Sequence, residues 1–416
     1  MKVKPEEQLM ETLLHRGYKY RIFPTEEQRS YFMQAFGCRR KVYNAYVDAL
    51  YRQLEEQGYE SGYIRMKTLS FVTPAAMKKE FAFLKDVDSL ALCNAQLDFK
   101  AAVRKFNEEY DKKSYTKRAI KREKTLGIKP TFRDLKGMPR FKSVKNGDFS
   151  FTTNNQAGNG SWCNITLRNG LLHIPKLGTS VKTKVHRKLP ENCIIKNATI
   201  SMDSRGWFYV SLGVEFFRDI EEITPQTFLG LDYAQQDFFV DSEDEKANYP
   251  HYYRKTEKRL AREQRKLSHM VKGSKNWERQ KKRISVLSAH VANQRKDWLH
   301  KRSTIIADQY EMVAVEDIDL RALGQTLKLA KNLQDNGFGM FRTMLQYKLE
   351  ERGKKFVKID RFYPSSKLCR HCGYIYEDLS LKDRSWVCPS CGADLDRDYN
   401  AAINIREAGK QLLSIA

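Results

Sequence analysis

Alternating apolar and polar positions mark the β-rich parts of the first half of the chain. The stretch YKYRIFP, residues 18–24, alternates like a strand and stops at a proline. Residues 147–216 contain short alternating runs separated by Asn-Gly, Arg-Gly and Pro, and hairpin turns are expected at RNG and DSRG. We expect the strand at 18–23 to join these runs in one small barrel.

Helical spacing of apolar residues fills the interval between these strands. Thr25 is a candidate N-cap for a long helix over 26–58, which we expect to break near Gly37. A second long helix is expected over 87–113, and the turn residues of 127–143 predict a loop. The pattern therefore predicts a helical segment, about 25–130, inserted in the barrel.

From residue 226 onward the pattern indicates an α/β arrangement. FLGLDY and DFFVDS predict a β-hairpin, EMVAVED and KFVKID predict buried strands, and helices are expected to end at Gly353 and to begin again at Asn400. Between them, residues 250–310 predict a very basic helical stretch broken near Gly273. In its second half one apolar face is expected, made of Ile284, Leu287, Val291, Trp298 and Ile305.

Composition narrows the class of partner. The 416 residues include 75 Lys or Arg against 51 Asp or Glu, which gives a net charge of +24. The basic residues cluster and are interleaved with aromatic ones, which favours a polyanionic partner over a merely solvated basic surface. No apolar run has the length of a signal peptide or of a membrane span, so we expect a cytosolic protein.

Four of the eight cysteines form a metal-binding pattern. Cys369 with Cys372, and Cys388 with Cys391, are Cys-x-x-Cys pairs, and a glycine follows each pair. Four thiolates at this spacing suit tetrahedral zinc and leave no open coordination position, so the predicted site is structural. His371 is expected to be exposed rather than a ligand. The isolated cysteines, Cys38, Cys93, Cys163 and Cys193, are expected to be buried thiols.

Three acidic residues lie at the ends of predicted elements, namely Asp232, Glu316 and Asp398. They can converge if their strands are neighbours in one sheet. Carboxylate oxygens are the ligands that Mg²⁺ prefers, and two such ions can activate a water against a phosphodiester, as in an RNase H-like nuclease. Alternatives remain open: Asp317 or Asp319 could replace Glu316, Asp396 could replace Asp398, and each acid could simply cap a turn or helix.

These segments resemble the transposon-encoded TnpB family, which is related to the type V CRISPR effectors. The resemblance rests on GLDY, VAVEDI, FYPSSKLCRHCG and DRDYNAAINI, and on YKYRIFPTEEQRSYF and PRFKS in the first half. It implies an α+β multidomain fold: a wedge-type β-barrel with an inserted helical recognition domain, and a RuvC (RNase H-like) nuclease domain with an inserted zinc ribbon. The implied domains are 1–24 and 136–225 (wedge), 25–135 (recognition), 226–366 and 396–416 (nuclease), and 367–395 (ribbon).

The resemblance also implies an activity, which is RNA-guided cleavage of DNA. The expected partners are a guide RNA derived from the transposon end, and target double-stranded DNA with its displaced strand and a short flanking motif that the protein reads. The protein is expected to be monomeric in this ribonucleoprotein and nucleoid-associated when bound to DNA. Asp232, Glu316 and Asp398 would hold two catalytic Mg²⁺ ions, and the four cysteines one structural Zn²⁺.

Further nucleic-acid contacts are expected outside the acids. They are expected at Ser89 and Cys93 of the motif-reading helix, where the family varies, and at Arg140, Lys142, Lys272 and Lys275. The basic stretches 104–145 and 254–302 could hold phosphates, and their aromatic residues could stack on bases. These aromatic residues are Tyr115, Phe132, Phe141, Trp277 and Trp298, and packing of a helix face is the alternative for Trp298.

One departure and several alternatives qualify this interpretation. The run Tyr233-Ala234-Gln235-Gln236 stands where the family has a small residue and glycine, which leaves the rate or substrate preference in question. The alternatives are a small type V CRISPR effector with an array-derived guide, a conventional transposase, and a guided DNA-binding repressor without cleavage. The complete set of acids argues against the repressor.

Overall fold

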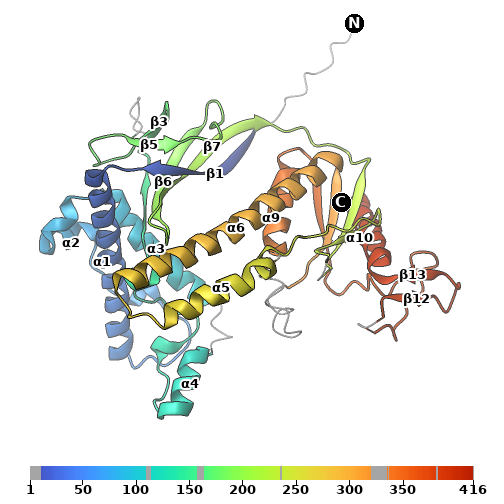
Figure 1. Ribbon diagram of the computed structural model, residues 1–416, viewed down its shortest axis with the longest axis horizontal. Coiled ribbons are helices and arrows are strands. Elements are labelled where there is room, and N and C mark those ends of the chain that lie inside the picture. The colour runs from blue at the N-terminus through green and yellow to red at the C-terminus, as the bar shows by residue number, and fades with distance from the viewer. Residues whose placement is uncertain are drawn as a thin grey trace, which may run out of the picture. The chain divides into compact units, whose positions relative to one another are not determined.

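The computed structural model describes residues 11–108, 114–156, 164–234, 237–319, 335, 337–380 and 383–415. Leu13–Arg218 forms one compact unit, and the chain from Asp219 onward forms a second (Figure 1). Within the described ranges, no helix has both the length and the apolar character needed to cross a membrane. The finer division into six segments remains our proposal.

The first unit is built on a curled, half-barrel sheet of seven strands in the order β2-β6-β7-β1-β5-β4-β3. The N-terminal strand β1 lies between β7 and β5, so the predicted joining of this strand to the later runs is confirmed. The strands are β1 (Glu11–Phe23), β2 (Ser150–Asn154), β3 (Thr166–Arg168), β4 (Leu171–His173), β5 (Val181–Lys184), β6 (Ile194–Met202) and β7 (Phe208–Asp219).

Alternation of side chains sets the two faces of this sheet. Tyr18, Tyr20 and Ile22 of β1 are buried, whereas Lys19 and Phe23 are exposed. The predicted hairpin turns are present: β3 and β4 pair around RNG, and β6 and β7 pair around DSRG. Strand β5 was not predicted, because the four residues VKTK are too short and too polar to stand out.

The helices of the first unit lie between β1 and β2 in the chain. They are α1 (Glu26–Glu56), α2 (Pro74–Glu80), α3 (Ser89–Glu108) and α4 (Lys117–Leu126), of which α2 and α4 were not individually predicted. Thr25 caps α1 through a capping box with Gln28. The expected break at Gly37 is wrong, since α1 is continuous. A single helical glycine costs only about 1 kcal/mol, which packing of the buried face of α1 outweighs.

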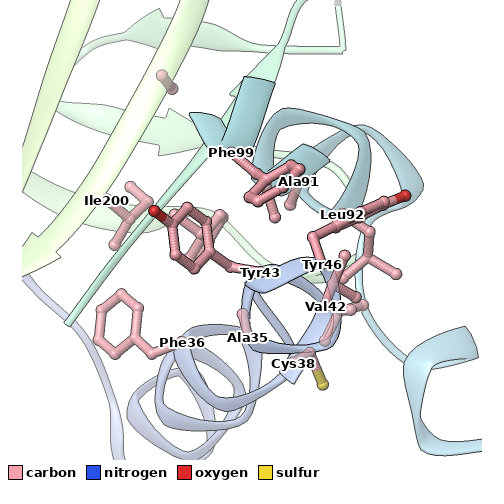
Figure 2. Close-up of a cluster of buried hydrophobic side chains, with 14 of the residues drawn as sticks. Ala35, Phe36, Cys38, Val42, Tyr43, Tyr46, Ala91, Leu92, Phe99 and Ile200 are labelled. Carbon is pink, nitrogen blue, oxygen red and sulfur yellow. The ribbon is translucent and has the colours of Figure 1, made fainter. Parts of the chain in front are cut away.

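Helices α1 and α3 pack on each other and on the sheet around an aromatic core (Figure 2). Val42 and Tyr46 of α1 lie close to Ala91 and Leu92 of α3 in this view. The rings of Tyr46 and Phe99 stack with their centroids 5.3 Å apart. Such pairs add specific geometry to the burial of a large apolar area, so this core fixes the angle between the two helices.

The isolated cysteines only partly follow the expectation of burial. Cys38 is buried, but Cys193 is half-buried and Cys93 is exposed on α3. Cys163 lies outside the described residues. The prediction for Cys93 failed because the apolar stripe of α3 runs through Leu92, Ala95 and Phe99, and residue 93 points off that stripe.

The second unit contains a four-stranded sheet in the order β11-β10-β8-β9. Its strands are β8 (Phe228–Asp232), β9 (Val240–Asp241), β10 (Met312–Glu316) and β11 (Lys355–Ile359), and its helices are α5 (Tyr252–Ser268), α6 (Lys275–Gln309), α9 (Phe338–Glu350) and α10 (Arg397–Ile415). Strand β8 pairs antiparallel with β9, which confirms the predicted hairpin, and parallel with β10. Side chains of α6 and α9 cover one face of the sheet, and α10 covers the other.

The basic helical stretch is a hairpin of α5 and α6, broken at Gly273 as predicted (Figure 1). The apolar face predicted for α6 is wrong at Ile305, which is 46% exposed, whereas Leu299 and Ile306 are fully or nearly buried. Residues seven apart drift about 20° per heptad around an α-helix. The stripe through Ile284 and Val291 has therefore moved by one position near the end of this 35-residue helix.

Two glycines allow α10 to lie directly on the sheet. A Cβ atom at Gly230 of β8 would collide with the backbone oxygen of Ala402 and the backbone nitrogen of Arg406. A Cβ atom at Gly409 of α10 would lie 2.6 Å from the Cβ atom of Ala314 in β10. These contacts are far below van der Waals distance, so both positions require glycine.

We therefore expect Gly230→Ala to destabilise the chain by about 3 kcal/mol or more, because helix backbone cannot move aside as a flexible side chain can. Urea unfolding of the full chain measures this change. Gly37→Ala is the matched control, since its Cβ atom would meet only the end of Arg40 at 3.9 Å. That control should stabilise α1 by about 0.5–1 kcal/mol. Equal effects of the two substitutions would contradict the close approach of α10.

Candidate metal centres and nucleic-acid surfaces

The three predicted acids lie on elements that meet at one edge of the sheet of the second unit. Asp232 ends β8 and Glu316 ends β10, and these strands are parallel neighbours, so their carboxyl ends share one edge. Asp398 lies in the first turn of α10, which packs on β8. Burial, followed by the charges of Glu316 and Asp398, raises the pKa of Asp232 well above its ordinary value. Each of the other two acids is therefore close enough to act on Asp232.

Glu316 is held from two sides. The hydroxyl of Ser365 donates to its Oε1 at 3.4 Å, and burial raises the pKa of its carboxyl group. Arg342 donates to the backbone oxygens of Glu316 and Ile318 at 3.1 and 3.3 Å, which fixes the end of β10. The alternative ligand Asp317 is instead in ion pairs with Arg342 and Arg361, at 3.7 and 3.8 Å.

Asp398 and its alternative Asp396 have different partners. Asp396 accepts a hydrogen bond from the backbone nitrogen of Tyr399 at 2.9 Å, so Asp396 caps α10 and the suggestion that Asp398 does so is wrong. The carboxylate of Asp398 is paired with Arg384 at 3.2 Å and with Arg397 at 3.1 Å. Asp319, the other alternative, is exposed.

A carboxylate cluster of this kind has the donor chemistry for hard divalent cations. Its oxygens are hard ligands. Burial first, and then the charges of Glu316 and Asp398, raise the pKa of Asp232, and a bound cation would neutralise these charges. The three acids are spaced more widely than the cysteines of the ribbon. Among the described residues, the four cysteines are the one group of three or more His, Cys, Asp or Glu side chains whose ligand atoms all lie within 4.8 Å of one another.

The four cysteines lie together, as predicted, with their sulfur atoms all within 4.8 Å of one another. The Sγ atoms of Cys369 and Cys391 are 3.7 Å apart, and those of Cys372 and Cys388 are 3.6 Å apart. Tetrahedral Zn–S bonds of about 2.3 Å require sulfur atoms about 3.8 Å apart. The set therefore fits zinc closely.

Two matching turns present the four sulfur atoms. In the first turn the amide of Gly373 donates to the Cys369 oxygen at 2.9 Å, and in the second Gly392 donates to Cys388 at the same distance. Both glycines have positive φ, of 77° and 71°, which a residue with a Cβ atom adopts only with strain. His371 is exposed, as expected.

The ribbon that carries these cysteines is fastened to the N-terminal half of α10. Its strands are β12 (Ser385–Val387) and β13 (Asp394–Asp396), which lie beside α10 in Figure 1. The buried amides of Asn400 and Asn404 both donate to the Leu368 oxygen, at 2.8 and 2.7 Å. The amide of Arg397 donates to the Arg384 oxygen at 2.8 Å. The folded ribbon thus holds the turn of α10 from which Asp398 projects.

The predicted nucleic-acid contacts outside the acids are mostly exposed. Ser89 and Cys93 lie one turn apart on α3, Lys272 and Lys275 flank the turn between α5 and α6, and Arg140 is exposed. Lys142 differs, because it is half-buried with its Nζ atom 4.1 Å from the Tyr43 ring centroid. Burial lowers the pKa of Lys142 to about 8.

The aromatic candidates divide into surface and core residues. Phe132 is 8% exposed and packs edge-on against Tyr51 and Tyr59, so the suggestion that it stacks on a base is wrong. Trp298 packs against Phe238 and Tyr249, which agrees with the helix-packing alternative. Phe141 is 45% exposed, whereas Tyr115 and Trp277 are half-buried.

A group of stacked cations on the outer face of the first unit's sheet was not predicted from the sequence. The guanidinium carbons of Arg21 and Arg205 lie 3.7 and 4.0 Å from the ring centroid of Trp207. Arg205 also donates to the Asp203 carboxylate at 2.8 Å and to the Tyr209 hydroxyl at 2.6 Å. The outward alternation of Arg21 and Trp207 was visible in the sequence, but their pairing required the order of the strands.

Tyr233, the first residue of the departure noted after Asp232, packs in the second unit. Its ring centroid lies 4.7 Å from that of Phe338 at the start of α9. Gln235 and Gln236 lie outside the described residues. The large side chain at 233 thus has a packing role beside the acids.

Comparisons with known proteins agree with this architecture. Family models match residues 338–405 ("Cas12f1-like, TNB domain"), 211–326 ("Probable transposase") and 10–58 ("Helix-turn-helix domain"). A protein of Streptomyces pristinaespiralis named "Putative RNA-guided DNA endonuclease" is 32% identical over 398 residues, which cover 95% of this chain and 89% of the relative. "Putative RNA-guided DNA endonuclease InsQ" of Escherichia coli K12 is 26% identical, over 96% and 93%.

Among solved structures, the "Cas12f1-sgRNA-target DNA complex" aligns with 95% of this chain and 99% of that chain. The alignment has 13% identity and a TM-score of 0.48.

The second unit has a RuvC-type, RNase H-like fold, and the chain also contains a curled wedge sheet. This fold is defined by the parallel strands that end in acids, the hairpin of β8 and β9, and the inserted four-cysteine ribbon. The chain belongs to the TnpB family, since the match to the Streptomyces relative extends over nearly all of both chains. The family predicted from the sequence motifs is therefore confirmed.

Proposed function

We propose that this protein is an RNA-guided DNA endonuclease, with a guide RNA derived from a transposon end. The observation that carries the proposal is the placement of Asp232, Glu316 and Asp398 at one edge of a RuvC-type sheet in a chain of the TnpB family. Base pairing with the guide would select the target, and the protein would read a short flanking motif. The net charge of +24 suits both nucleic acids as partners.

Asp232, Glu316 and Asp398 would hold two Mg²⁺ ions, for which their carboxylate oxygens are suitable ligands. When bound, such ions supply charge stabilisation and an activated water for phosphodiester hydrolysis. Ser365 would orient the Glu316 carboxylate, and Arg342 would hold the strand end beneath it. Arg384 and Arg397 would balance the charge of Asp398 until a cation takes their place.

One Zn²⁺ on the four cysteines would have a structural role, because the shell is complete without water. Its effect on the reaction would pass through the contacts of the ribbon with Asn400 and Asn404. We place the protein in the cytoplasm, as a monomer in a ribonucleoprotein that joins the nucleoid when bound to DNA.

Purification of the chain from cells that carry its native flanking DNA tests the proposal. Sequencing the RNA that accompanies the protein should give one structured RNA with a variable guide segment at its end. A plasmid matched to that guide should be cut in Mg²⁺ and left intact in EDTA. A guide taken from a repeat array would identify a CRISPR effector, binding without cutting would identify a repressor, and absence of a defined RNA would overturn the proposal.

The stacked cations of the wedge sheet provide a test of RNA binding. We expect Arg21→Ala to weaken guide RNA binding about 3- to 10-fold and to lower the slope of log affinity against log salt by about one, because it removes a cation held by Trp207. Arg205→Ala should change both quantities less, because the charge of Arg205 is already paired with Asp203. Arg218→Ala is the control, since Arg218 is exposed and carries the same charge without a stacked ring. An equal loss in that control would assign the effect to charge alone.

A further inference from the structure

Phe362 is an exposed aromatic residue beside the candidate nuclease centre. Its side chain is 85% exposed, more than any other large apolar residue in the described parts of the chain, including Val271 at 79%. It lies in the loop that leaves β11 and leads to the four-cysteine ribbon. A phenyl ring that is exposed to water does not gain the free energy that burial gives most phenylalanines. A binding partner that covers the ring would provide that free energy.

The exposure is imposed by an ordered turn. The Asp360 Oδ1 atom accepts a hydrogen bond from the Phe362 amide at 2.7 Å, and the Asp360 oxygen accepts one from the Tyr363 amide at 3.1 Å. Tyr363 packs its ring on the apolar cluster between α10 and the sheet. The residues on both sides are therefore anchored, and the ring between them is held outward.

The same loop touches the strand end that carries Glu316. The Asp317 amide donates to the Ile359 oxygen at 3.1 Å, and Ser365 donates to the Glu316 carboxylate at 3.4 Å. Phe362 stands between these two attachment points, three residues from Ser365. The loop that carries the ring is thus attached on both sides to the strand end with one of the three candidate metal ligands.

Two cationic residues, Lys358 and Arg361, come shortly before Phe362 in the chain. Arg361 is half-exposed and is in an ion pair with Asp317 at 3.8 Å, and Lys358 is exposed. A protein-docking surface is expected to offer a contiguous apolar patch, whereas one ring flanked by cations is the pattern of single-stranded nucleic-acid binding. The cations can hold phosphates while the ring takes a base.

We propose that Phe362 is a stacking platform for an unpaired base of the DNA strand that enters the acid centre. The inference rests on the proposed function, because it assigns the substrate of that same site. A phenyl ring has no hydrogen-bonding group, so it accepts any base by its π face, as a guided nuclease requires of a contact near the cut. Stacking would keep the strand at a fixed distance from Asp232, Glu316 and Asp398.

The test uses the complete ribonucleoprotein with a guide-matched duplex. We expect Phe362→Ala to lower the single-turnover cleavage rate about 10-fold at limiting DNA, and Phe362→Trp to keep or raise it, since a base stack is worth roughly that factor. Phe362→Leu, which retains apolar bulk without a π face, should fall close to alanine. Phe217→Ala is the control, because Phe217 is 60% exposed but belongs to the first unit, and it should change nothing.

A spectroscopic measurement separates stacking from a structural effect. A 2-aminopurine base placed near the cut in the target strand should be quenched on binding to a complex made inactive by Asp232→Asn. The quench should disappear when Phe362→Ala is added and return with Phe362→Trp. The melting temperature should remain unchanged, because the ring makes little contact within the chain.

The possible outcomes separate the two hypotheses. Failure of the wild-type complex to cut guide-matched DNA would overturn the proposed function and this inference with it. Cutting by the wild type together with an unchanged rate and quench in Phe362→Ala would overturn the inference alone. A defect of Phe362→Ala seen in cells but absent with purified components would assign the ring to a protein partner, which also contradicts stacking on DNA.

Discussion

Guided DNA cleavage should fall by about 1,000-fold or more when Asp232 is replaced by alanine, while guide RNA and target DNA remain bound. The reason is that a metal-holding carboxylate contributes several kcal/mol to stabilising the charge that develops during phosphodiester hydrolysis. Asp232 ends the central strand β8, and Glu316 and Asp398 both act on its pKa. Single-turnover cleavage of a guide-matched plasmid measures the loss, and a filter-binding assay measures retention of RNA.

Asp317→Asn is the matched control for this prediction. Asp317 follows Glu316 directly, but its carboxylate is in ion pairs with Arg342 and Arg361. We expect its removal to change the cleavage rate by less than about 3-fold, the scale of a mostly exposed ion pair. A loss at Asp317 as large as that at Asp232 would reassign the ligand set.

Thermal stability should distinguish loss of a ligand from loss of the fold. The pKa of Asp232 is raised in the native chain, so between the ordinary pKa of an aspartate and this raised value the native chain binds more protons than the unfolded chain. The free energy of unfolding therefore falls as the pH rises through that interval. Asp232→Asn removes this loss of stability, and the metal-free variant should melt no lower than metal-free wild type at neutral pH. Added Mg²⁺ should stabilise the wild type and leave the variant unchanged.

The second large effect is expected from removal of zinc. Cys388→Ala should abolish zinc binding, from about one ion per chain to none, and should lower cleavage about 100-fold or more. The ribbon has only a small apolar cluster, around Leu379, Trp386 and Leu395, so metal binding must provide most of its folding free energy. Without the ribbon, the contacts of Leu368 with Asn400 and Asn404 and of Arg384 with Asp398 are lost.

Metal analysis, together with the cleavage assay, measures this effect. Cys193→Ser is the control, because Cys193 is half-buried in the first unit, is not among the expected nucleic-acid contacts, and does not belong to the four-cysteine cluster of the described residues. It should keep both zinc and activity. Full cleavage by zinc-free Cys388→Ala would show that the ribbon does not position Asp398.

The sequence carried enough information to predict the second unit closely. Asp232 and Glu316 each end a short apolar run, and such runs in a chain with intervening helices predict parallel strands whose acidic ends meet. The cysteine spacing predicts the metal arrangement because a Cys-x-x-Cys turn is local, and its geometry depends on few distant contacts.

Several of the predictions that failed depend on tertiary packing rather than on local sequence. The burial of Phe132 follows from where Tyr51 and Tyr59 lie, and no local pattern reports that. The continuity of α1 at Gly37 follows from packing that outweighs propensity. The stacking of Arg21 on Trp207 requires β1 and β7 to be neighbours, although the two residues lie 186 positions apart in the chain.

The hydrogen bonds of Asn400 and Asn404 to Leu368 have a thermodynamic consequence. They make α10 common to the cysteine site and to the acid site, so the two sites are linked through one rigid element. Binding free energies of linked sites are reciprocal. If zinc binding to the ribbon raises the affinity of the acid site for a divalent cation, binding of that cation must raise the affinity of the ribbon for zinc by the same factor. A chelator should therefore extract zinc more slowly from the Mg²⁺-loaded protein than from the Mg²⁺-free protein.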